Sequence, residues 1–373
     1  MYSAKNLTIF LKYLFKSKWT FTLPKKNKFI LVDGIYNPFL KYIKAKDFTV
    51  LHRRGEEINF SIFLRCLIQF KFTTLDYCSE FIKEVSPKLI LTAFDYHTMF
   101  YKLSKRTRIK TLALQKGKRS KNESIIDNSK YFFPKNSKKK FHVDYFLVYS
   151  SAVKNFYSKR ISGKFFEIGS FENNFYKPVF KKQKKEIVFI SNFGERRKEK
   201  SENENLIALH LHELAKKRNM KFKILPRYRN SQKIFDKEKD FYNKILQNEF
   251  EFITNRNKTS YDLLLSYKYI FSSYSSLAAE CMTKGARVGF VMFKSKQNPT
   301  WDYRFGDYES LGNKGPFWCA SNKIDKKEIE RVFKFVTQTN ERKWLKKTNA
   351  YIKKVIGFDY QNKTFRNIIK SYT

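Results

Sequence analysis

Short apolar runs alternate with segments of helical spacing between residues 28 and 171. Runs such as 28–34 and 88–95 end at polar or Gly-containing turns, which is typical of buried strands. Segments such as 58–84 carry apolar residues three and four positions apart, which predicts helices. We expect strands over 28–34, 48–55, 88–95, 109–119, 143–150 and 165–171, and helices over 58–84, 96–104 and 151–160. This alternation predicts βαβ units and a parallel sheet with helices on both faces.

The same alternation restarts after residues 172–185, which contain a proline and a run of lysines and favour a linker. Beyond it we expect strands over 185–191, 221–227, 250–254, 268–273, 286–293 and 315–321, and helices over 202–217, 235–247, 260–267, 275–285 and 325–339. Helices are also expected over 341–373. The pattern therefore predicts an α/β protein with two facing Rossmann-like domains and C-terminal closing helices.

The expected domain boundaries follow the changes of pattern. We expect a first Rossmann-like domain over 25–175, a second over 176–345, and closing helices over 346–373. Residues 1–24 precede the first domain as an amphipathic N-terminal segment. Within them, the apolar residues of 5–19 fall on one helical stripe flanked by lysines. Such a helix suits either packing on its own domain or an anionic membrane face, and both interpretations stay open.

The charge balance is strongly basic. The 373 residues contain 77 Lys and Arg against 34 Asp and Glu, a net charge of +43. Such a chain favours anionic partners, namely nucleic acid, anionic lipid headgroups or phosphorylated substrates. The lysines are spread along the whole chain, however, and Phe (39) and Tyr (23) are also abundant. A general compositional bias would produce the same excess, so charge alone does not choose the partner.

Several classes are excluded by what the sequence lacks. The four cysteines form no CxxC pair, which excludes a disulfide scaffold and a zinc ribbon and fits a reducing cytosol. The longest apolar stretches, such as 187–191 and 288–293, are far shorter than the ~20 residues of a membrane span. No HExxH, P-loop or GxGxxG motif is present, and no cluster of closely spaced acidic residues suggests a cation. We therefore expect neither a metal nor a cofactor.

Ligands of open α/β sheets bind beyond the carboxyl ends of the strands, so polar residues at those ends are the candidates. Ser275 and Ser276 follow a strand and open a helix, whose free N–H groups suit a phosphate. Glu280 lies one turn further on the same helix face and could accept from a ribose hydroxyl. The alternative is an ordinary serine cap followed by a solvated glutamate.

Two more loops follow strands of the second half. Pro226 stops a strand, and Arg227 and Arg229 come directly after it. Guanidinium groups bind phosphates through paired hydrogen bonds, although a basic surface turn would have the same sequence. Asn192 and Gly194 lie in the polar loop 191–199, which follows the first strand of this half. The serine pair and the arginine loop follow strands of the same half, so they could meet one mono- or diphosphate group. The loop 191–199 is a third candidate, at a position that faces the interdomain cleft in such folds.

The first half offers candidate bases and anion contacts. Asp33 and Asp95 end buried strands, where a carboxylate could deprotonate a sugar hydroxyl, but helix capping is the commoner role of such an aspartate. Of the two we favour Asp95 as the base, and His97, two residues away, is the alternative. The loop after the next strand contains Gln115, Lys116 and Arg119, the candidates for the acceptor side of the site. Lys116 and Arg119 could hold an anionic acceptor or donor.

At this point the residues resemble a family. The two-domain layout and the SSYSSLAAE segment look like nucleotide-sugar glycosyltransferases of the GT-B fold. The segments AFDYHTMFYKL, LALQKGKR, FFEIGSFENN and SSYSSLAAECMTKGARVGFV resemble surface-carbohydrate (O-antigen) biosynthesis proteins of bacteria. The serine pair also resembles the phosphate-binding motif of bacterial sialyltransferases and Kdo transferases. Those enzymes pair it with a His-Pro motif, and this chain has Leu225-Pro226 at that place.

The resemblance implies a metal-independent glycosyltransferase of hexosyl or Kdo/sialyl type. A nucleotide sugar would bind the second domain, and a lipid-linked or polysaccharide acceptor of O-antigen or capsule assembly would bind the first. We expect such an enzyme in the cytoplasm, peripheral at the inner membrane face. Two alternatives stay open, a basic nucleic-acid-binding protein and a non-catalytic polysaccharide-assembly protein. Nucleic acid is the less favoured partner because no helix-turn-helix, zinc-finger or RNP motif is present.

Overall fold

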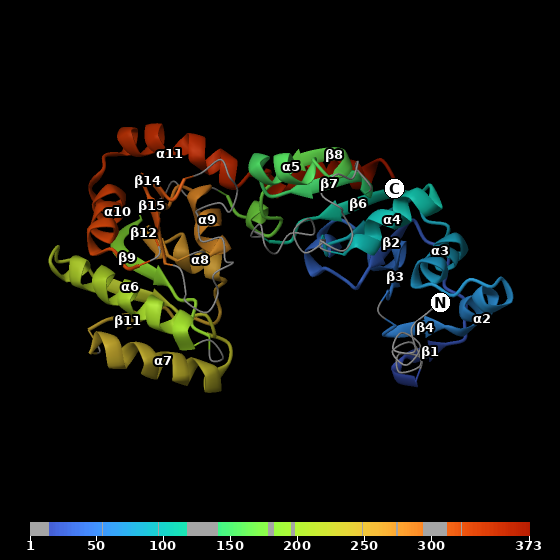
Figure 1. Cartoon of the computed structure of the whole chain (residues 1–373), viewed down its shortest axis with the longest axis horizontal. Helices are drawn as coiled ribbons and strands as arrows, with labels where there is room; N and C mark the ends of the chain where they lie inside the picture. The colour runs from blue at the N-terminus through green and yellow to red at the C-terminus, as the bar shows by residue number, and fades with distance from the viewer. Residues whose placement is uncertain are drawn as a thin grey trace.

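The computed structural model describes residues 15–53, 55–95, 97–117, 141–177, 183–194, 198–247, 249–273, 275–293, 312–321 and 323–373, without the side chains of 198–203. The chain forms two α/β domains that lie side by side along the long axis of the molecule (Figure 1). A six-stranded sheet organises the first domain and a seven-stranded sheet the second. The expected fold class is therefore confirmed.

The sheet of the first domain has the strand order β3-β2-β5-β6-β7-β8, and its neighbouring strands run parallel. Alternate residues of one strand enter different cores. Ile30 and Val32 pack on one face, whereas Phe29 and Leu31 pack on the other. This two-sided burial is why the strands read as continuous apolar runs. The strands are β2 (Phe29–Val32), β3 (Phe48–Leu51), β5 (Leu89–Thr92), β6 (Lys110–Leu114), β7 (Phe141–Val148) and β8 (Ile161–Glu167).

Helices cover both faces of this sheet. One face is covered by α2 (Phe60–Ile68), α3 (Thr74–Val85), α4 (Thr98–Thr107) and α5 (Ser151–Tyr157). The other face packs against the 3-10 turns η1 (Asn37–Lys41) and η4 (Asn173–Phe175), and a further turn, η2 (Ala45–Asp47), precedes β3. The expected single helix over 58–84 is wrong, because Phe70 has a φ of 54° and Thr73 starts α3 with a capping box to Asp76.

A small two-stranded sheet accompanies the first domain. It pairs β1 (Lys18–Thr20) in parallel with β4 (Glu57–Asn59). The expected helix over 5–19 is therefore wrong at Lys18 and Trp19, which belong to a strand, while residues 1–14 lie outside the described part of the chain. In the parts that the structure describes, no helix combines the length and apolar character needed to cross a bilayer.

The second domain repeats the plan with the order β11-β10-β9-β12-β13-β15-β14. Its strands are β9 (Lys184–Ile190), β10 (Phe222–Leu225), β11 (Glu251–Phe252), β12 (Tyr267–Ser272), β13 (Arg287–Phe293), β14 (Lys314–Gly315) and β15 (Trp318–Ser321). Its helices are α6 (Lys198–Lys216), α7 (Gln232–Leu246), α8 (Ser260–Leu264), α9 (Ser276–Met282) and α10 (Lys326–Gln338). One continuous apolar core joins strands and helices. The central strands β10, β9 and β12 are direct neighbours, so their carboxyl ends share one edge.

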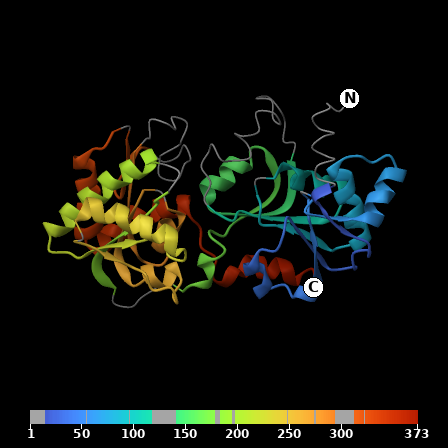
Figure 2. The ribbon, with the colours of Figure 1, turned by 90° about the horizontal axis from the view of Figure 1, so that it is seen from below.

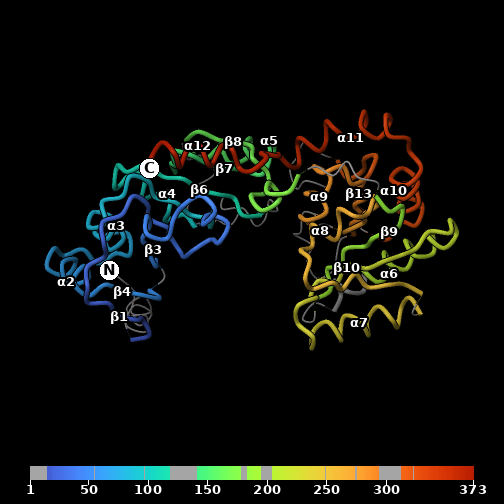
Figure 3. Tube along the Cα trace, turned by 180° about the vertical axis from the view of Figure 1, so that it is seen from behind, coloured from blue at the N-terminus to red at the C-terminus, as the bar shows by residue number. Residues whose placement is uncertain are grey.

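The C-terminal helices link the two domains. After α11 (Glu341–Val355) packs on the second domain, the chain returns, and α12 (Lys363–Lys370) lies against the first domain (Figures 2 and 3). Phe365 of α12 stacks on Phe39 with ring centroids 4.9 Å apart. Asn362 Nδ2 donates to the Phe171 carbonyl at 3.0 Å. One closing helix therefore packs on each domain: α11 on the second, and α12 on the face of the first sheet that also packs against η1.

Candidate functional site

Three loops of the second domain meet at the shared carboxyl edge of β9, β10 and β12. The Arg227 guanidinium, just after β10, donates to the carbonyl oxygens of Asn192 at 3.4 Å and Phe193 at 3.3 Å in the loop after β9. Arg227 itself is exposed, and the preceding Pro226 is buried. The structure thus brings together Asn192, Pro226 and Arg227, which the sequence analysis placed in separate loops.

Buried carboxylates hold these loops in place. Glu238 of α7 is fully buried, and its two oxygens accept from the backbone N–H groups of Arg227 at 3.0 Å and Tyr228 at 3.1 Å. Burial raises the pKa of the Glu238 carboxyl. Glu204 accepts from the N–H of Asn192 at 3.1 Å and lies 3.5 Å from the hydroxyl of Ser273. Sequence reasoning missed both glutamates, because an isolated acid on an amphipathic helix carries no signal for what it contacts.

The serine pair lies at the third loop. Ser275 occupies the N-cap position of α9, yet its hydroxyl caps no helical N–H among the described residues. Its backbone N–H instead donates to the Ser272 hydroxyl at 3.1 Å. Ser275 and Ser276 are both partly exposed, so their hydroxyls can reach a ligand. Simple side-chain capping, the alternative interpretation of Ser275, is therefore not what the structure shows.

Arg229 and Gly194 border the same loops. The Arg229 guanidinium donates to the Asn255 carbonyl, beyond β11, at 3.2 Å. Partial burial lowers the pKa of Arg229. This contact turns Arg229 toward the outer edge of the sheet, away from the contact that Arg227 makes with Asn192. Gly194 is partly exposed and is the last described residue before a gap at 195–197.

Glu280 lies between the two domains. Its carboxylate accepts from the Tyr149 hydroxyl, which follows β7 of the first domain, and from the Tyr261 hydroxyl of α8. Glu280 is 5% exposed, and burial raises its pKa although both tyrosine hydrogen bonds oppose that shift. A ribose hydroxyl would have to displace a tyrosine to reach this carboxylate. The ribose contact stays a prediction, and the observed role of Glu280 is to join the carboxyl edges of the two sheets.

Further contacts surround this junction. Lys284 is 1% exposed, and its ammonium donates to the Tyr176 carbonyl at 2.5 Å and lies 3.3 Å from the centroid of the Phe358 ring. Burial lowers the pKa of Lys284 to about 7. The Asn173 amide donates to the Thr283 hydroxyl at 3.0 Å. The turn after α9 is thus attached to the first domain by side chains that only the fold brings together.

The base candidates of the first domain gather at the ends of β2, β3 and β5. The Arg53 Nε atom contacts both oxygens of Asp33, at 3.0 and 3.1 Å. The His97 Nε2 atom lies 3.9 Å from the same carboxylate. Asp95 is 0% exposed, and its carbonyl accepts from the Tyr101 hydroxyl at 2.6 Å. A base must touch its substrate, so the structure favours His97, which is partly exposed, over Asp95.

The acceptor-side loop residues differ in their surroundings. Gln115 is fully buried, and its carbonyl oxygen accepts from the Tyr149 N–H at 2.8 Å. This contact ties β6 to the end of β7, so the observed role of Gln115 is to support the loop, and its acceptor-side role stays a prediction. Lys116 is exposed, with its ammonium 5.1 Å from the centroid of the Tyr36 ring. Arg119 lies outside the described residues.

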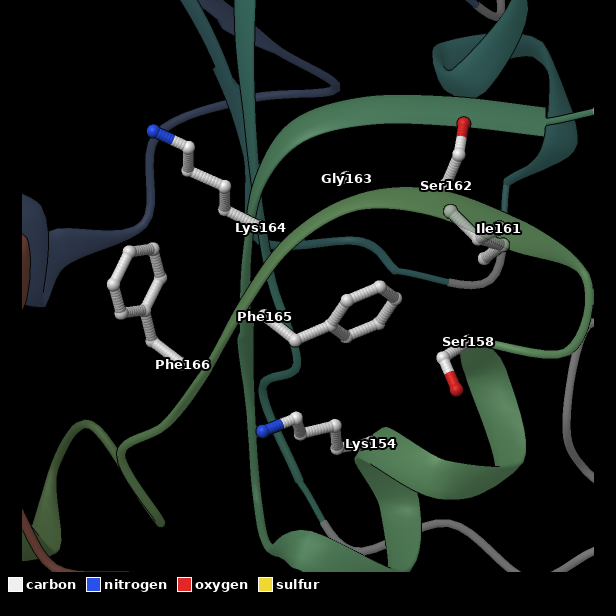
Figure 4. A pocket seen from close by; sticks show the side chains of 8 residues that line it. All are labelled: Lys154, Ser158, Ile161, Ser162, Gly163, Lys164, Phe165 and Phe166. Atoms are coloured by element: carbon white, nitrogen blue, oxygen red, sulfur yellow. The ribbon is translucent and has the colours of Figure 1, made fainter.

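A separate surface depression of 520 Å³ lies between α5 and β8 (Figure 4). Its lining includes Lys154, Ser158, Lys164 and Phe165. None of the candidate site residues lines it, and it belongs to the outer edge of the first sheet. The candidate residues that the structure describes lie instead near the carboxyl ends of β2, β5 and β6 in the first domain and of β9, β10 and β12 in the second.

The paired sheets with facing carboxyl edges define a class of protein. The UDP-GlcNAc 2-epimerase of Methanocaldococcus jannaschii matches at 11% identity and a TM-score of 0.50, over 93% of this chain and 99% of that chain. A co-structure of S. aureus MnaA with UDP matches at 14% identity and a TM-score of 0.48, over 92% of this chain and 95% of that chain. A glycosyltransferase from Rickettsia africae matches at 11% identity and a TM-score of 0.48, over 94% of this chain and 98% of that chain. At these identities the likeness shows the fold alone, which is the two-domain GT-B fold.

The family is narrower than the fold. Residues 112–373 match the family described as "putative O-antigen biosynthesis protein". This match spans more than half of the chain, so the chain belongs to that family. A comparison with curated protein sequences finds no match. The resemblance noted from the sequence is confirmed for both fold and family.

Proposed function

We propose that this protein is a glycosyltransferase that moves a sugar from a nucleotide-activated donor to an acceptor of surface-polysaccharide assembly. The observation that carries the proposal is the convergence of three loops at one edge of the second sheet. Arg227 joins the loops after β10 and β9 through the carbonyls of Asn192 and Phe193, and Glu204 connects the loop after β9 with Ser273 after β12. Membership of the O-antigen biosynthesis family supports the acceptor class.

The donor side rests on the charge and exposure of the loops. The Arg227 guanidinium is exposed and held beside backbone at the strand ends, and Ser275 and Ser276 offer hydroxyls from the neighbouring loop. Phosphate oxygens are strong acceptors for such donors. In the proposed reaction these groups bind the nucleotide phosphates and stabilise the negative charge that develops as the sugar leaves. Arg229 and Gly194 border this site, and Glu280 is the proposed ribose contact.

The acceptor side rests on the cluster at the ends of β2, β3 and β5. His97 is proposed as the base that takes the proton of the acceptor hydroxyl. Asp33, 3.9 Å from His97 Nε2, would stabilise the protonated imidazole, while Arg53 holds the Asp33 carboxylate in place. Asp95 is proposed to support this loop from the core. Lys116, Arg119 and the buried Gln115 are proposed to shape the acceptor side.

The proposed setting is the cytoplasmic face of the inner membrane, where a lipid-linked acceptor would be presented. The net charge of +43 favours an anionic surface there. No cofactor or metal is included in the proposal, since the loops themselves supply the cations for the leaving phosphate. The donor assay below distinguishes transfer of a hexose from transfer of a Kdo- or sialyl-type sugar.

The test compares Arg227→Ala with Arg342→Ala, an exposed arginine on α11. Each purified variant is incubated with radiolabelled UDP-, GDP- and CMP-sugars, first alone to measure nucleotide-sugar binding and then with a membrane extract as acceptor to measure transfer of the label. Losing a hydrogen bond to a charged group costs about 1.5–3 kcal/mol, so Arg227→Ala should weaken nucleotide binding by at least about tenfold. Equal binding by the two variants would contradict the donor assignment. His97→Gln should lower turnover while nucleotide affinity stays unchanged.

A further inference from the structure

Helix α2 is apolar on two opposite faces. Its inner face carries Ile62 and Cys66, which are buried in the core of the first domain. Its outer face carries Phe60, Leu64, Leu67 and Ile68, spaced at i, i+4, i+7 and i+8 on one stripe, and all are exposed. Ile68 is 70% exposed. A surface helix normally places polar residues on its outer face, so this stripe needs a partner.

Neighbouring residues extend the apolar stripe. Phe21, just after β1, is 71% exposed, and its ring lies 5.5 Å from the Phe60 ring, centroid to centroid. Phe70, just after α2, is 82% exposed. We call Phe21, Phe60, Leu64, Leu67, Ile68 and Phe70 the α2 surface. Figures 1 and 3 show α2 and the β1–β4 pair at the end of the first domain farthest from the second domain.

The chain around the α2 surface is basic. Residues 15–28 contain five lysines, and α2 and its end add Arg65 and Lys71. Four of these cations are paired with acids, namely Lys18 with Glu57, Lys28 with Asp47, Arg65 with Glu84 and Lys71 with Glu80. Lys16, Lys25 and Lys26 are exposed, and none of them forms an ion pair with the residues that the structure describes. Exposed aromatic rings bordered by lysines suit the headgroup region of an anionic bilayer. A second copy of the chain would instead bring these like charges together.

We propose that the α2 surface docks the protein on an anionic lipid bilayer. Phe21, Ile68 and Phe70 would enter the boundary between headgroups and acyl chains, and the lysines would contact lipid phosphates. The proposal refines the membrane setting of the proposed function by naming the surface that makes the contact. It does not depend on sugar transfer, because vesicle binding is measured without nucleotide or acceptor.

The test is co-flotation of the full-length protein with vesicles. One set contains about one third phosphatidylglycerol in phosphatidylcholine, and the other contains phosphatidylcholine alone. The double variant Leu64→Gln, Ile68→Gln is compared with Leu206→Gln, Leu345→Gln, whose leucines are exposed by 43% and 46% in the second half of the chain. Removing one buried large apolar side chain changes a partition equilibrium by roughly tenfold, so the α2 variant should bind at least that much more weakly. The control variant should bind like the wild type.

Three results would overturn the proposal. One is a wild-type protein that does not float with anionic vesicles at ~0.1 M salt. Another is an α2 variant that binds as strongly as the control, since the contact would then be made by another segment, such as residues 1–14. The third is a wild-type mass of two chains by light scattering that falls to one chain in the α2 variant. Circular dichroism of both double variants confirms that neither loss reflects unfolding.

Discussion

Replacing Tyr149 with Phe removes one hydroxyl from the junction between the domains and leaves the ring in place. Tyr149 is 1% exposed, and its hydroxyl donates to the Glu280 carboxylate, which is itself buried. A hydrogen bond to a charged group contributes about 1.5–3 kcal/mol to stability. Tyr242 offers a matched control, since it is equally buried and donates to the neutral Ser191 hydroxyl at 3.0 Å. Tyr242→Phe should therefore cost only about 0.5–1.5 kcal/mol.

The difference between the two variants should depend on pH. Burial raises the pKa of Glu280 above its ordinary value, so the carboxyl takes up a proton when the pH falls below that raised pKa. The Tyr149 hydrogen bond then joins two neutral groups, and the cost of Tyr149→Phe should fall toward that of Tyr242→Phe. Above the raised pKa the bond is charge-assisted, and the cost should reach its full size.

Urea unfolding of both variants and the wild type at several pH values measures the loss of unfolding free energy that each replacement causes. Unfolding is followed by tryptophan fluorescence and by far-UV circular dichroism, because a two-domain protein yields one free energy only if the two transitions coincide. A cost of Tyr149→Phe that equals the cost of Tyr242→Phe at every pH would refute the reasoning. It would mean that Glu280 does not carry a charge at the junction, or that the two domains are not joined through it.

Two other changes test the backbone and the charge at the same junction. Gly169 has a φ of 73°, and a Cβ there would lie 1.9 Å from the Gly357 carbonyl oxygen. Gly169→Ala should therefore lower the free energy of unfolding by more than the ~1–2 kcal/mol that a left-handed residue costs alone. Gly117→Ala is the control and should be near neutral, because a Cβ at Gly117 would have nothing within 4 Å. Burial lowers the pKa of Lys284 to about 7 in the folded protein. Between roughly pH 7 and pH 10 the Lys284 amine is therefore protonated in the unfolded chain but largely neutral in the folded one. The free energy of unfolding of the wild type should then rise with pH, by up to about 1.4 kcal/mol per pH unit. Lys284→Met should lose this slope in urea titrations, and an unchanged slope would contradict the assignment.

The sheets could be predicted from the sequence because buried parallel strands are apolar throughout. Phe29–Val32 and Leu89–Thr92 stand out as runs between polar turns, and the structure has strands there. The boundary between α2 and α3 could not be found from periodicity, because both helices keep apolar spacing across it. Its signal was local chemistry, the Thr73 and Asp76 capping box.

The candidate site was predictable only in part. Strand ends point to one edge of a sheet, so Asn192, Pro226 and Ser275 could be grouped from the order of elements alone. What each side chain contacts depends on tertiary packing. From the sequence, Glu280 is either a ribose contact or a solvated helix residue, whereas in the structure its partner is Tyr149, 131 residues away. No local pattern encodes a contact between two domains.

Binding of a nucleotide-activated sugar by the second domain is tested by thermal unfolding of the wild-type protein with CMP, UDP, GDP, CDP or a short oligonucleotide. A ligand that binds the native state raises the unfolding temperature. We expect one of the mononucleotides to raise the unfolding temperature, and this stabilisation should persist at ~0.2 M salt because a pocket of specific contacts is little screened. Stabilisation by the oligonucleotide alone, lost at the same salt, would contradict it and indicate a nucleic-acid-binding protein.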